Sequence, residues 1–287
     1  MSDTANVRRI RSSDRIELAA DDVGPRDAPT VVLLHGGGQT RHSWSGAMAA
    51  LVARGYRVIN VDTRGHGDSD WSPHGDYHLD SLVQDLRAVV ADLTGPYAIV
   101  GASLGGATAI HAAGAGIGAA AIVLVDIVPE PEMAGVGRIV GFMRANLGGF
   151  ATLEEAADAV AAYNPERPRS SDPSGLMRNL RLRDDGRLYW HWDPRITQSE
   201  PGQHHAVVQR SAIAMAERTD LPVLVVRGLK SDVVSDAGVA AFRRILPALE
   251  VANVGGAGHM VAGDRNDAFN ASVLAFLERH LPVEAVA

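Results

Sequence analysis

The chain contains no cysteine among its 287 residues. Disulfides, thiolate metal sites and cysteine nucleophiles are therefore excluded, and any covalent chemistry must use oxygen or nitrogen. Basic residues are also in the minority, with 27 Lys and Arg against 34 Asp and Glu and a formal net charge of −7. Nucleic-acid binding needs clustered basic side chains to neutralise phosphates, so we do not expect a nucleic-acid partner.

Long apolar runs are missing as well. The longest, at about residues 119–128, has roughly half of the ~20 residues that a membrane helix needs. The N-terminal segment lacks the apolar stretch and small-residue cleavage site of a signal peptide. Hydrophobic residues make up 46% and charged residues 21%, an ordinary balance for a globular chain. We therefore expect a cytoplasmic protein without a membrane partner.

Short runs rich in β-branched residues alternate with helical patterns. Such an alternation predicts right-handed crossovers and an α/β fold, in which helices cover both faces of a mostly parallel sheet. The helical pattern is clearest at residues 79–93, where apolar residues recur every three or four positions. The first four predicted strands are Thr30–His35, Arg57–Asp62, Tyr97–Gly101 and Ala121–Asp126. A hairpin of Val7–Arg11 and Arg15–Ala19 is predicted at the sheet edge.

The alternation stops between residue 129 and about residue 219. Weak helices in that segment are interrupted by Pro165, Pro168, Pro173, Pro194 and Pro201, and a stretch of this length inside one domain is usually a functional lid. The strand pattern resumes at Val223–Arg227 and Leu249–Val254, before a last helix at about residues 264–280. We therefore predict a core of residues 1–128 and 216–287 with a cap insertion at 129–215.

Ser103 is the candidate nucleophile. The segment Gly101-Ala102-Ser103-Leu104-Gly105 fits the G-x-S-x-G pattern and lies between a predicted strand and a predicted helix. A turn this sharp strains the backbone at the serine, and the flanking glycines remove side chains that would collide. The alternative is an ordinary turn with a helix-capping serine. The motifs described next favour the nucleophile.

A serine hydroxyl needs a base within hydrogen-bond reach. His259 follows the last predicted strand in a glycine-rich loop, and the carboxyl ends of parallel strands share one edge of the sheet. We therefore predict that His259 is the base. Of the other histidines, His35 is expected to hydrogen-bond the backbone, and His66, which lies in a loop, is expected to be solvated.

The base in turn needs a carboxylate to orient it. Asp232 follows the strand Val223–Arg227 and precedes His259 by 27 residues, which suits neighbouring strand ends. Asp232 could instead cap the helix near Ser235. Asp126, at the end of the strand after the nucleophile's helix, is the rival. We predict Asp232 as the acid and retain Asp126 as the alternative, which asparagine variants of each would distinguish.

A glycine loop, His35-Gly36-Gly37-Gly38, follows the first parallel strand. Bare backbone there can aim N–H groups at an oxyanion, so we expect the Gly37 N–H, with Gly38 as a possible further donor, to act together with the Leu104 N–H. A phosphate loop is the alternative. Neither the lysine of G-x-x-x-x-G-K-[ST] nor a G-x-G-x-x-G with its acidic ribose ligand is present.

The succession of HGGG, Asp62-Thr-Arg-Gly-His-Gly-Asp-Ser69, GASLGG, RGLKSD and GAGHM resembles the α/β-hydrolase superfamily over about residues 31–281. The resemblance implies an eight-stranded sheet, a helical cap, and a triad in the order Ser103, Asp232, His259. It also implies that Asp62–Ser69 is a structural turn. Epoxide hydrolases and haloalkane dehalogenases carry an aspartate at the nucleophile position, so those activities are not expected.

The sequence most resembles the esterases, lactonases and cofactor-free haloperoxidase-like members. The function that this implies is hydrolysis of a small ester or lactone through an acyl-enzyme, without a metal or organic cofactor. Carbon–carbon or amide hydrolysis and perhydrolysis are alternatives, as is a ligand receptor with little turnover. Gly38, Trp44, Trp190 and Met260 are the candidate substrate-binding residues. The sequence leaves open whether the protein is a monomer or a homodimer.

Overall fold

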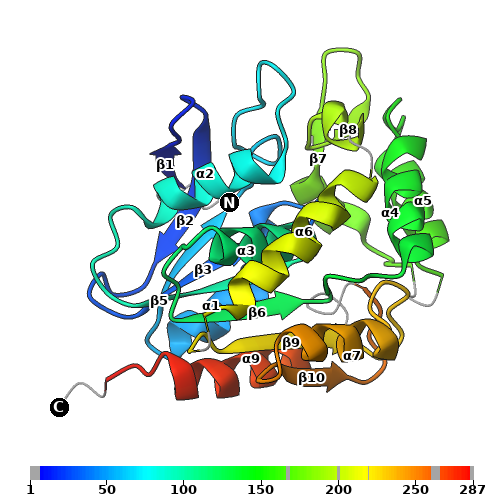
Figure 1. Ribbon diagram of the computed structural model, residues 1–287. Coiled ribbons are helices and arrows are strands. Elements are labelled where there is room, and N and C mark those ends of the chain that lie inside the picture. Colours follow the sequence, from blue (N-terminus) through cyan, green and yellow to red (C-terminus); the bar gives the residue numbers. More distant parts are fainter. Residues whose placement is uncertain (1–6, 166–168, 199–200, 219, 260–265, 285–287) are drawn as a thin grey trace.

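An eight-stranded sheet forms the centre of the molecule (Figure 1). The computed structural model describes residues 7–165, 169–198, 201–218, 220–259 and 266–284. The strand order is β1-β2-β4-β3-β5-β6-β9-β10. The strands are β1 (Val7–Arg11), β2 (Glu17–Val23), β3 (Thr30–Leu34), β4 (Arg57–Val61), β5 (Tyr97–Ala102), β6 (Ala121–Val125), β9 (Val223–Gly228) and β10 (Glu250–Val254). The predicted α/β fold is confirmed.

The edge hairpin differs from the prediction in its second strand. β1 and β2 pair antiparallel, as do β2 and β4, whereas all pairs from β4 to β10 are parallel. The second strand was expected at 15–19 and begins instead at Glu17. Arg15 has a φ of 73° in the turn, a conformation that a strand residue does not adopt.

Helices cover both faces of the sheet because its central strands are apolar on both sides. Val32, Ile99 and Val225 face one apolar cluster, while Val31, Val100 and Val226 face another. The first cluster includes residues of α2 (Leu79–Val90), α3 (Leu104–Gly114), α6 (Pro201–Ala216) and α7 (Asp236–Ile245). The second includes residues of α1 (Ser45–Ala53) and α9 (Asn266–His280).

The chain between β6 and β9 builds a separate layer. Figure 1 shows α4 and α5 side by side with the small β7–β8 sheet near them. Its elements are α4 (Met133–Ala145), α5 (Leu153–Tyr163), η2 (Pro173–Asn179), β7 (Leu180–Leu182), β8 (Leu188–Trp190) and η3 (Pro194–Gln198). An apolar cluster that includes Met143, Phe150 and Trp190 holds them together.

The last helix of the predicted cap, α6, packs on the core. A Cβ at Gly114 of α3 would lie 2.7 Å from the carbonyl oxygen of Ser211 in α6, and His111 Nδ1 is 2.8 Å from Ser211 Oγ. The division at residues 129–215 therefore remains a prediction, with α6 in contact with α3. In the part of the chain that the structure describes, no helix is long and apolar enough to cross a membrane.

Candidate active site

Ser103 occupies a strained turn between β5 and α3. Its φ of 46° and ψ of −110° lie outside the regions that L-residues usually adopt. The flanking glycines are required by close packing: a Cβ at Gly101 would lie 2.4 Å from the Gly105 carbonyl oxygen, and one at Gly105 would lie 2.3 Å from that of Leu34. The Ser103 hydroxyl makes no capping hydrogen bond to α3. Its side chain lines a cavity instead.

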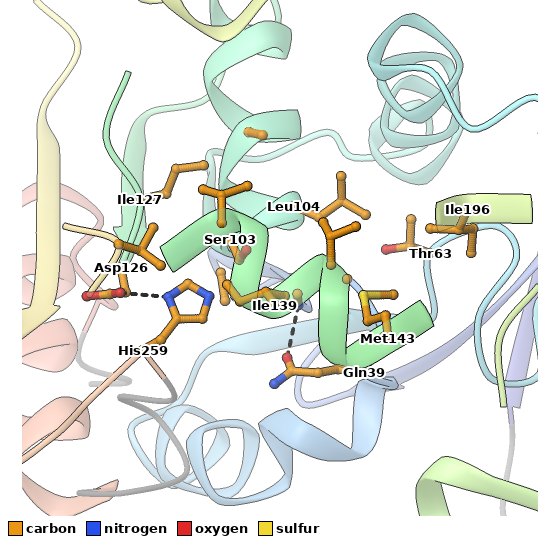
Figure 2. Close-up of a pocket in the computed structure, with 18 of the residues that line it drawn as sticks. Gln39, Thr63, Ser103, Leu104, Asp126, Ile127, Ile139, Met143, Ile196 and His259 are labelled. Atoms are coloured by element: carbon orange, nitrogen blue, oxygen red, sulfur yellow. Dashed lines mark hydrogen bonds and ion pairs between the residues drawn. The ribbon is translucent and has the colours of Figure 1, made fainter. Parts of the chain in front are cut away.

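His259 lines the same cavity and is oriented by a buried carboxylate. Its Nδ1 lies 2.7 Å from Oδ2 of Asp126, a residue with no exposed surface. Figure 2 shows the imidazole with one ring nitrogen toward Asp126 and the other facing away from it, on the side of Ser103. A neutral imidazole whose Nδ1–H is fixed in this way presents a basic Nε2.

The carboxylate beside His259 therefore comes from Asp126 and not from Asp232, which corrects the preferred expectation. Asp232 Oδ2 lies 2.6 Å from Arg138 Nη2 on α4. A tight turn after β9, closed by a 3.0 Å hydrogen bond from the Ser231 N–H to the Gly228 carbonyl, precedes Asp232. Asp126 follows β6 directly, and its φ of 49° turns the chain at the strand end.

Three groups satisfy the Asp126 carboxylate, two from the end of β9 and one from the loop after β10. The Gly228 N–H donates to Oδ1 at 3.2 Å, and the Ser231 hydroxyl donates to Oδ2 at 2.5 Å. His259 is the third partner. A buried carboxylate without such hydrogen-bond donors would be costly in free energy. Ser231 was not predicted as a site residue, although it stands directly before Asp232, the aspartate that the sequence favoured.

The glycine loop lies beside Ser103. A Cβ at Gly36 would lie 3.5 Å from Ser103 Cβ. The Gly36 N–H donates to Gln39 Oε1 at 3.0 Å and the Gly38 N–H to His66 Nε2 at 3.1 Å, so Gly38 does not offer the expected free donor. Among the residues that the structure describes, none accepts a hydrogen bond from the Gly37 N–H.

Leu104 places a second free N–H near this loop. It is the first residue of α3, and the first N–H groups of an α-helix have no intrahelical partner. A Cβ at Gly37 would lie 3.8 Å from Leu104 Cδ2, so the glycine loop and the helix start are in contact. Two backbone donors are thus available next to the Ser103 turn.

Two buried histidines hold the glycine loop. His35 Nδ1 lies 2.8 Å from the Gly36 carbonyl oxygen, and its Nε2 accepts the Thr63 N–H at 3.0 Å, which confirms the predicted backbone role. His66 is only 1% exposed, so the expectation that it is solvated is wrong. Burial lowers the pKa of His35 to about 4 and that of His66 to about 3. Both rings are therefore neutral and can accept hydrogen bonds at neutral pH.

The Asp62–Ser69 segment acts as the structural turn that the resemblance implied. Asp62 accepts the Arg41 N–H at 2.6 Å and the Asp68 N–H at 2.9 Å. The Arg64 guanidinium donates twice to Asp85 at 2.6 Å and once to Asp14 at 2.8 Å. The charged side chains of this segment are therefore paired within the structure beside the site.

The cavity has a volume of about 540 Å³ and a mainly apolar lining. Gly38, Trp44 and Trp190, three of the predicted substrate-binding residues, line it, and Met260 lies outside the described residues. Helix α4 closes one side: a Cβ at Gly38 would lie 3.3 Å from Met143 Cε. Other lining side chains include Leu104, Ile139 and Ile196 (Figure 2). Val136 and Phe142 also line the cavity.

Polar atoms without partners also belong to this lining. Trp190 Nε1, His204 Nε2 and His205 Nδ1 are buried and unpaired, and all three residues line the cavity. Burial, with a smaller contribution from His78, lowers the pKa of His204. Helical position alone gave no sign that these histidines face the site. Within the described ranges, no group of three His, Asp or Glu residues could hold a metal ion.

Comparison with known proteins now fixes the family. A family model described as the alpha/beta hydrolase fold matches residues 29–265. The chain belongs to the α/β-hydrolase family. The match therefore covers most of the length of the chain.

Several relatives of this α/β hydrolase are esterases by name. Esterase Rv0045c of Mycobacterium tuberculosis is 32% identical over 225 residues, which are 76% of this chain and 72% of that protein. A solved structure of that esterase aligns with a TM-score of 0.75 at 28% identity, covering 95% of this chain and 92% of that one. Protein phosphatase methylesterase 1 of Mus musculus is 31% identical over 161 residues, but the match covers only 54% of this chain and 39% of that protein.

The fold match extends to a more distant hydrolase. The crystal structure of E-2-(acetamidomethylene)succinate hydrolase aligns with a TM-score of 0.82 at 24% identity, covering 95% of this chain and 99% of that one. At this identity the likeness concerns the fold alone.

Proposed function

We propose that this α/β hydrolase cleaves a small carboxylic ester or lactone through an acyl-enzyme on Ser103. The observation that carries the proposal is that His259, held at Nδ1 by the buried Asp126, shares a cavity with a serine on a strained turn. The relatives named as esterases support ester hydrolysis.

The reaction follows from the positions of these groups. Ser103 Oγ attacks the ester carbonyl while His259 Nε2 takes its proton, and Asp126 stabilises the imidazolium that forms. The N–H groups of Gly37 and Leu104 bind the oxyanion. His259 then protonates the leaving alkoxide, and the acyl group stays on Ser103. Water, deprotonated by His259, attacks the acyl-enzyme and releases the carboxylic acid.

The lining favours a neutral substrate with an apolar acyl or alcohol group. Among the described residues, Arg64 is the only Lys or Arg that lines the cavity, and its guanidinium is paired with Asp85 and Asp14. A substrate carboxylate would therefore enter without a free cationic partner, which is costly in an apolar site. The cavity volume falls within the range of small-molecule sites.

A fluorophosphonate probe tests the nucleophile directly. We expect one phosphonylated residue, Ser103, located by mass spectrometry, together with turnover of short-chain aryl esters. Ser103→Ala should lose both while keeping its thermal unfolding transition. Equal labelling or turnover in that variant would exclude the serine mechanism. A labelled Ser103 with only trace turnover of every ester tried would favour the ligand-receptor alternative.

A further inference from the structure

We propose that Ser231 is a positioning residue of the reaction, which acts by holding the Asp126 carboxylate against His259. The inference rests on the proposed function. It assigns a role to the hydroxyl of the Arg227–Asp232 segment, whose aspartate was expected to be the acid.

The direction of the Ser231 hydroxyl proton follows from its neighbours. Ser231 Oγ accepts two backbone N–H groups, from Val233 and from Val234, each at 3.1 Å. It also lies 2.5 Å from Asp126 Oδ2. Because two donors already point at the oxygen, its single proton is directed to the carboxylate. The hydroxyl is therefore an oriented donor and does not rotate among several partners.

Ser231 and His259 share one carboxylate oxygen. Asp126 Oδ2 receives both the Ser231 hydroxyl and, at 2.7 Å, the His259 Nδ1–H, while Oδ1 receives the Gly228 N–H. The carboxylate is thereby fixed at both oxygens, and its plane sets the direction of the imidazole. Orientation of the base by its acid is worth orders of magnitude in kcat, so a group that fixes the acid contributes through it.

The position of Ser231 separates this role from substrate binding. Ser231 is not among the residues that line the cavity, whereas Ser103, Asp126 and His259 are. Loss of its hydroxyl should therefore lower kcat and the rate of fluorophosphonate labelling, with little change in KM. If Ser231 were merely structural, its replacement would lower stability and leave kcat unchanged.

The test compares three variants of Ser231 with a serine in the same segment. Ser231→Ala removes the hydrogen-bond donor. Ser231→Cys keeps a side chain of similar size with a weaker donor, and Ser231→Thr retains the hydroxyl. Ser235→Ala is the matched control, because Ser235 caps α7 by accepting the Gly238 N–H at 3.2 Å and does not hydrogen-bond Asp126. Steady-state kinetics with an aryl ester, the second-order labelling rate and the unfolding temperature are measured for each.

We expect kcat to fall about tenfold in Ser231→Ala and Ser231→Cys, since a hydrogen bond to a charged group is lost. Ser231→Thr should restore kcat to within about threefold of the original protein. Ser235→Ala should lower the unfolding temperature without lowering kcat. If Ser231→Ala does not fold, the kcat values of Ser231→Cys and Ser231→Thr test the inference instead.

Two results would overturn the inference: a kcat in folded Ser231→Ala or Ser231→Cys within twofold of the original protein, or a fall in kcat of the same size in Ser235→Ala. A failure of the proposed function is seen separately, because the unmodified protein would then be neither labelled at Ser103 nor active. In that case the proposed role of Ser231 would be excluded together with the proposed function.

Discussion

His259 Nδ1 and Asp126 Oδ2 lie 2.7 Å apart although 133 positions separate the two residues in the chain. The contact depends on the strand order, because Asp126 follows β6 and His259 follows β10, with β9 between them in the sheet. The β9 end supplies two hydrogen-bond donors to the same carboxylate. Three strand ends thus cooperate in orienting one imidazole.

The choice between the two carboxylates can be measured directly. Asp126→Asn should lower kcat by about 10⁴-fold, because an amide in place of the carboxylate favours the wrong imidazole tautomer. Asp232→Asn should lower kcat by less than about tenfold, since it removes a partly exposed ion pair with Arg138. Aryl-ester kinetics of both variants provide the comparison. A larger loss in Asp232→Asn would return the acid to the position that the sequence favoured.

Two glycines of α4 should respond in opposite ways to alanine. A Cβ at Gly135 would lie 2.2 Å from the Asp232 carbonyl oxygen, so Gly135→Ala must push α4 away from the β9 loop. A Cβ at Gly137 would meet nothing within 4 Å, so Gly137→Ala should stabilise the helix by up to about 1 kcal/mol. We expect a lower unfolding temperature and a lower kcat/KM in Gly135→Ala only. Equal stabilisation by both substitutions would contradict the close approach of α4.

Acyl-chain preference should follow the lining that α4 contributes. Ile139 faces the cavity near Ser103 (Figure 2), so Ile139→Trp fills space that a long acyl chain would use. The ratio of kcat/KM for aryl octanoate to that for aryl acetate should fall by about tenfold or more. Ile213→Trp on α6 is the control, because Ile213 is 55% exposed. An unchanged ratio in Ile139→Trp would place the acyl group elsewhere.

Stability should fall at acidic pH because two buried histidines stay neutral in the folded state. Burial lowers the pKa of His35 from 6.5 to about 4 and that of His66 to about 3. Below pH 6.5 the unfolded chain binds protons that the folded one does not, so the free energy of unfolding decreases as pH falls through this range. The two rings together contribute a slope that approaches about 2.7 kcal/mol per pH unit.

Urea unfolding at a series of pH values tests this slope. His66→Gln should be less stable at neutral pH, because it disturbs the hydrogen bond that His66 accepts from the Gly38 N–H. It should nevertheless show a shallower loss of stability on acidification, since one buried titrating ring is gone. An unchanged slope would mean that His66 is protonated alike in both states.

That Ser103 and His259 line one cavity could be predicted from the sequence because their signals are local. Ser103 stands in a motif whose glycines are dictated by contacts within the turn, and His259 follows a strand in a glycine-rich loop. The sheet could be predicted because its apolar runs are short and rich in β-branched residues, as in strands that are buried on both faces.

Which carboxylate lies beside His259 could not be predicted, because two carboxylates follow strands that end at the same edge of the sheet. The path of the chain after β9, where a turn carries Asp232 toward Arg138, decides between them. The path of the chain after β9 cannot be inferred from the positions of the two aspartates in the sequence. His66 was misjudged for a similar reason: a loop residue is buried when another segment covers it, and the Gly38 N–H from a distant loop lies against its ring.

The backbone at Ser103 also has a consequence for stability. Its φ of 46° costs an L-residue about 1–3 kcal/mol, which glycine does not incur. Ser103→Gly and Ser103→Ala should be equally inactive, yet the glycine variant should unfold at the higher temperature. We therefore expect thermostability and turnover to be opposed at this position, so that selection for heat resistance alone would favour loss of the Ser103 side chain.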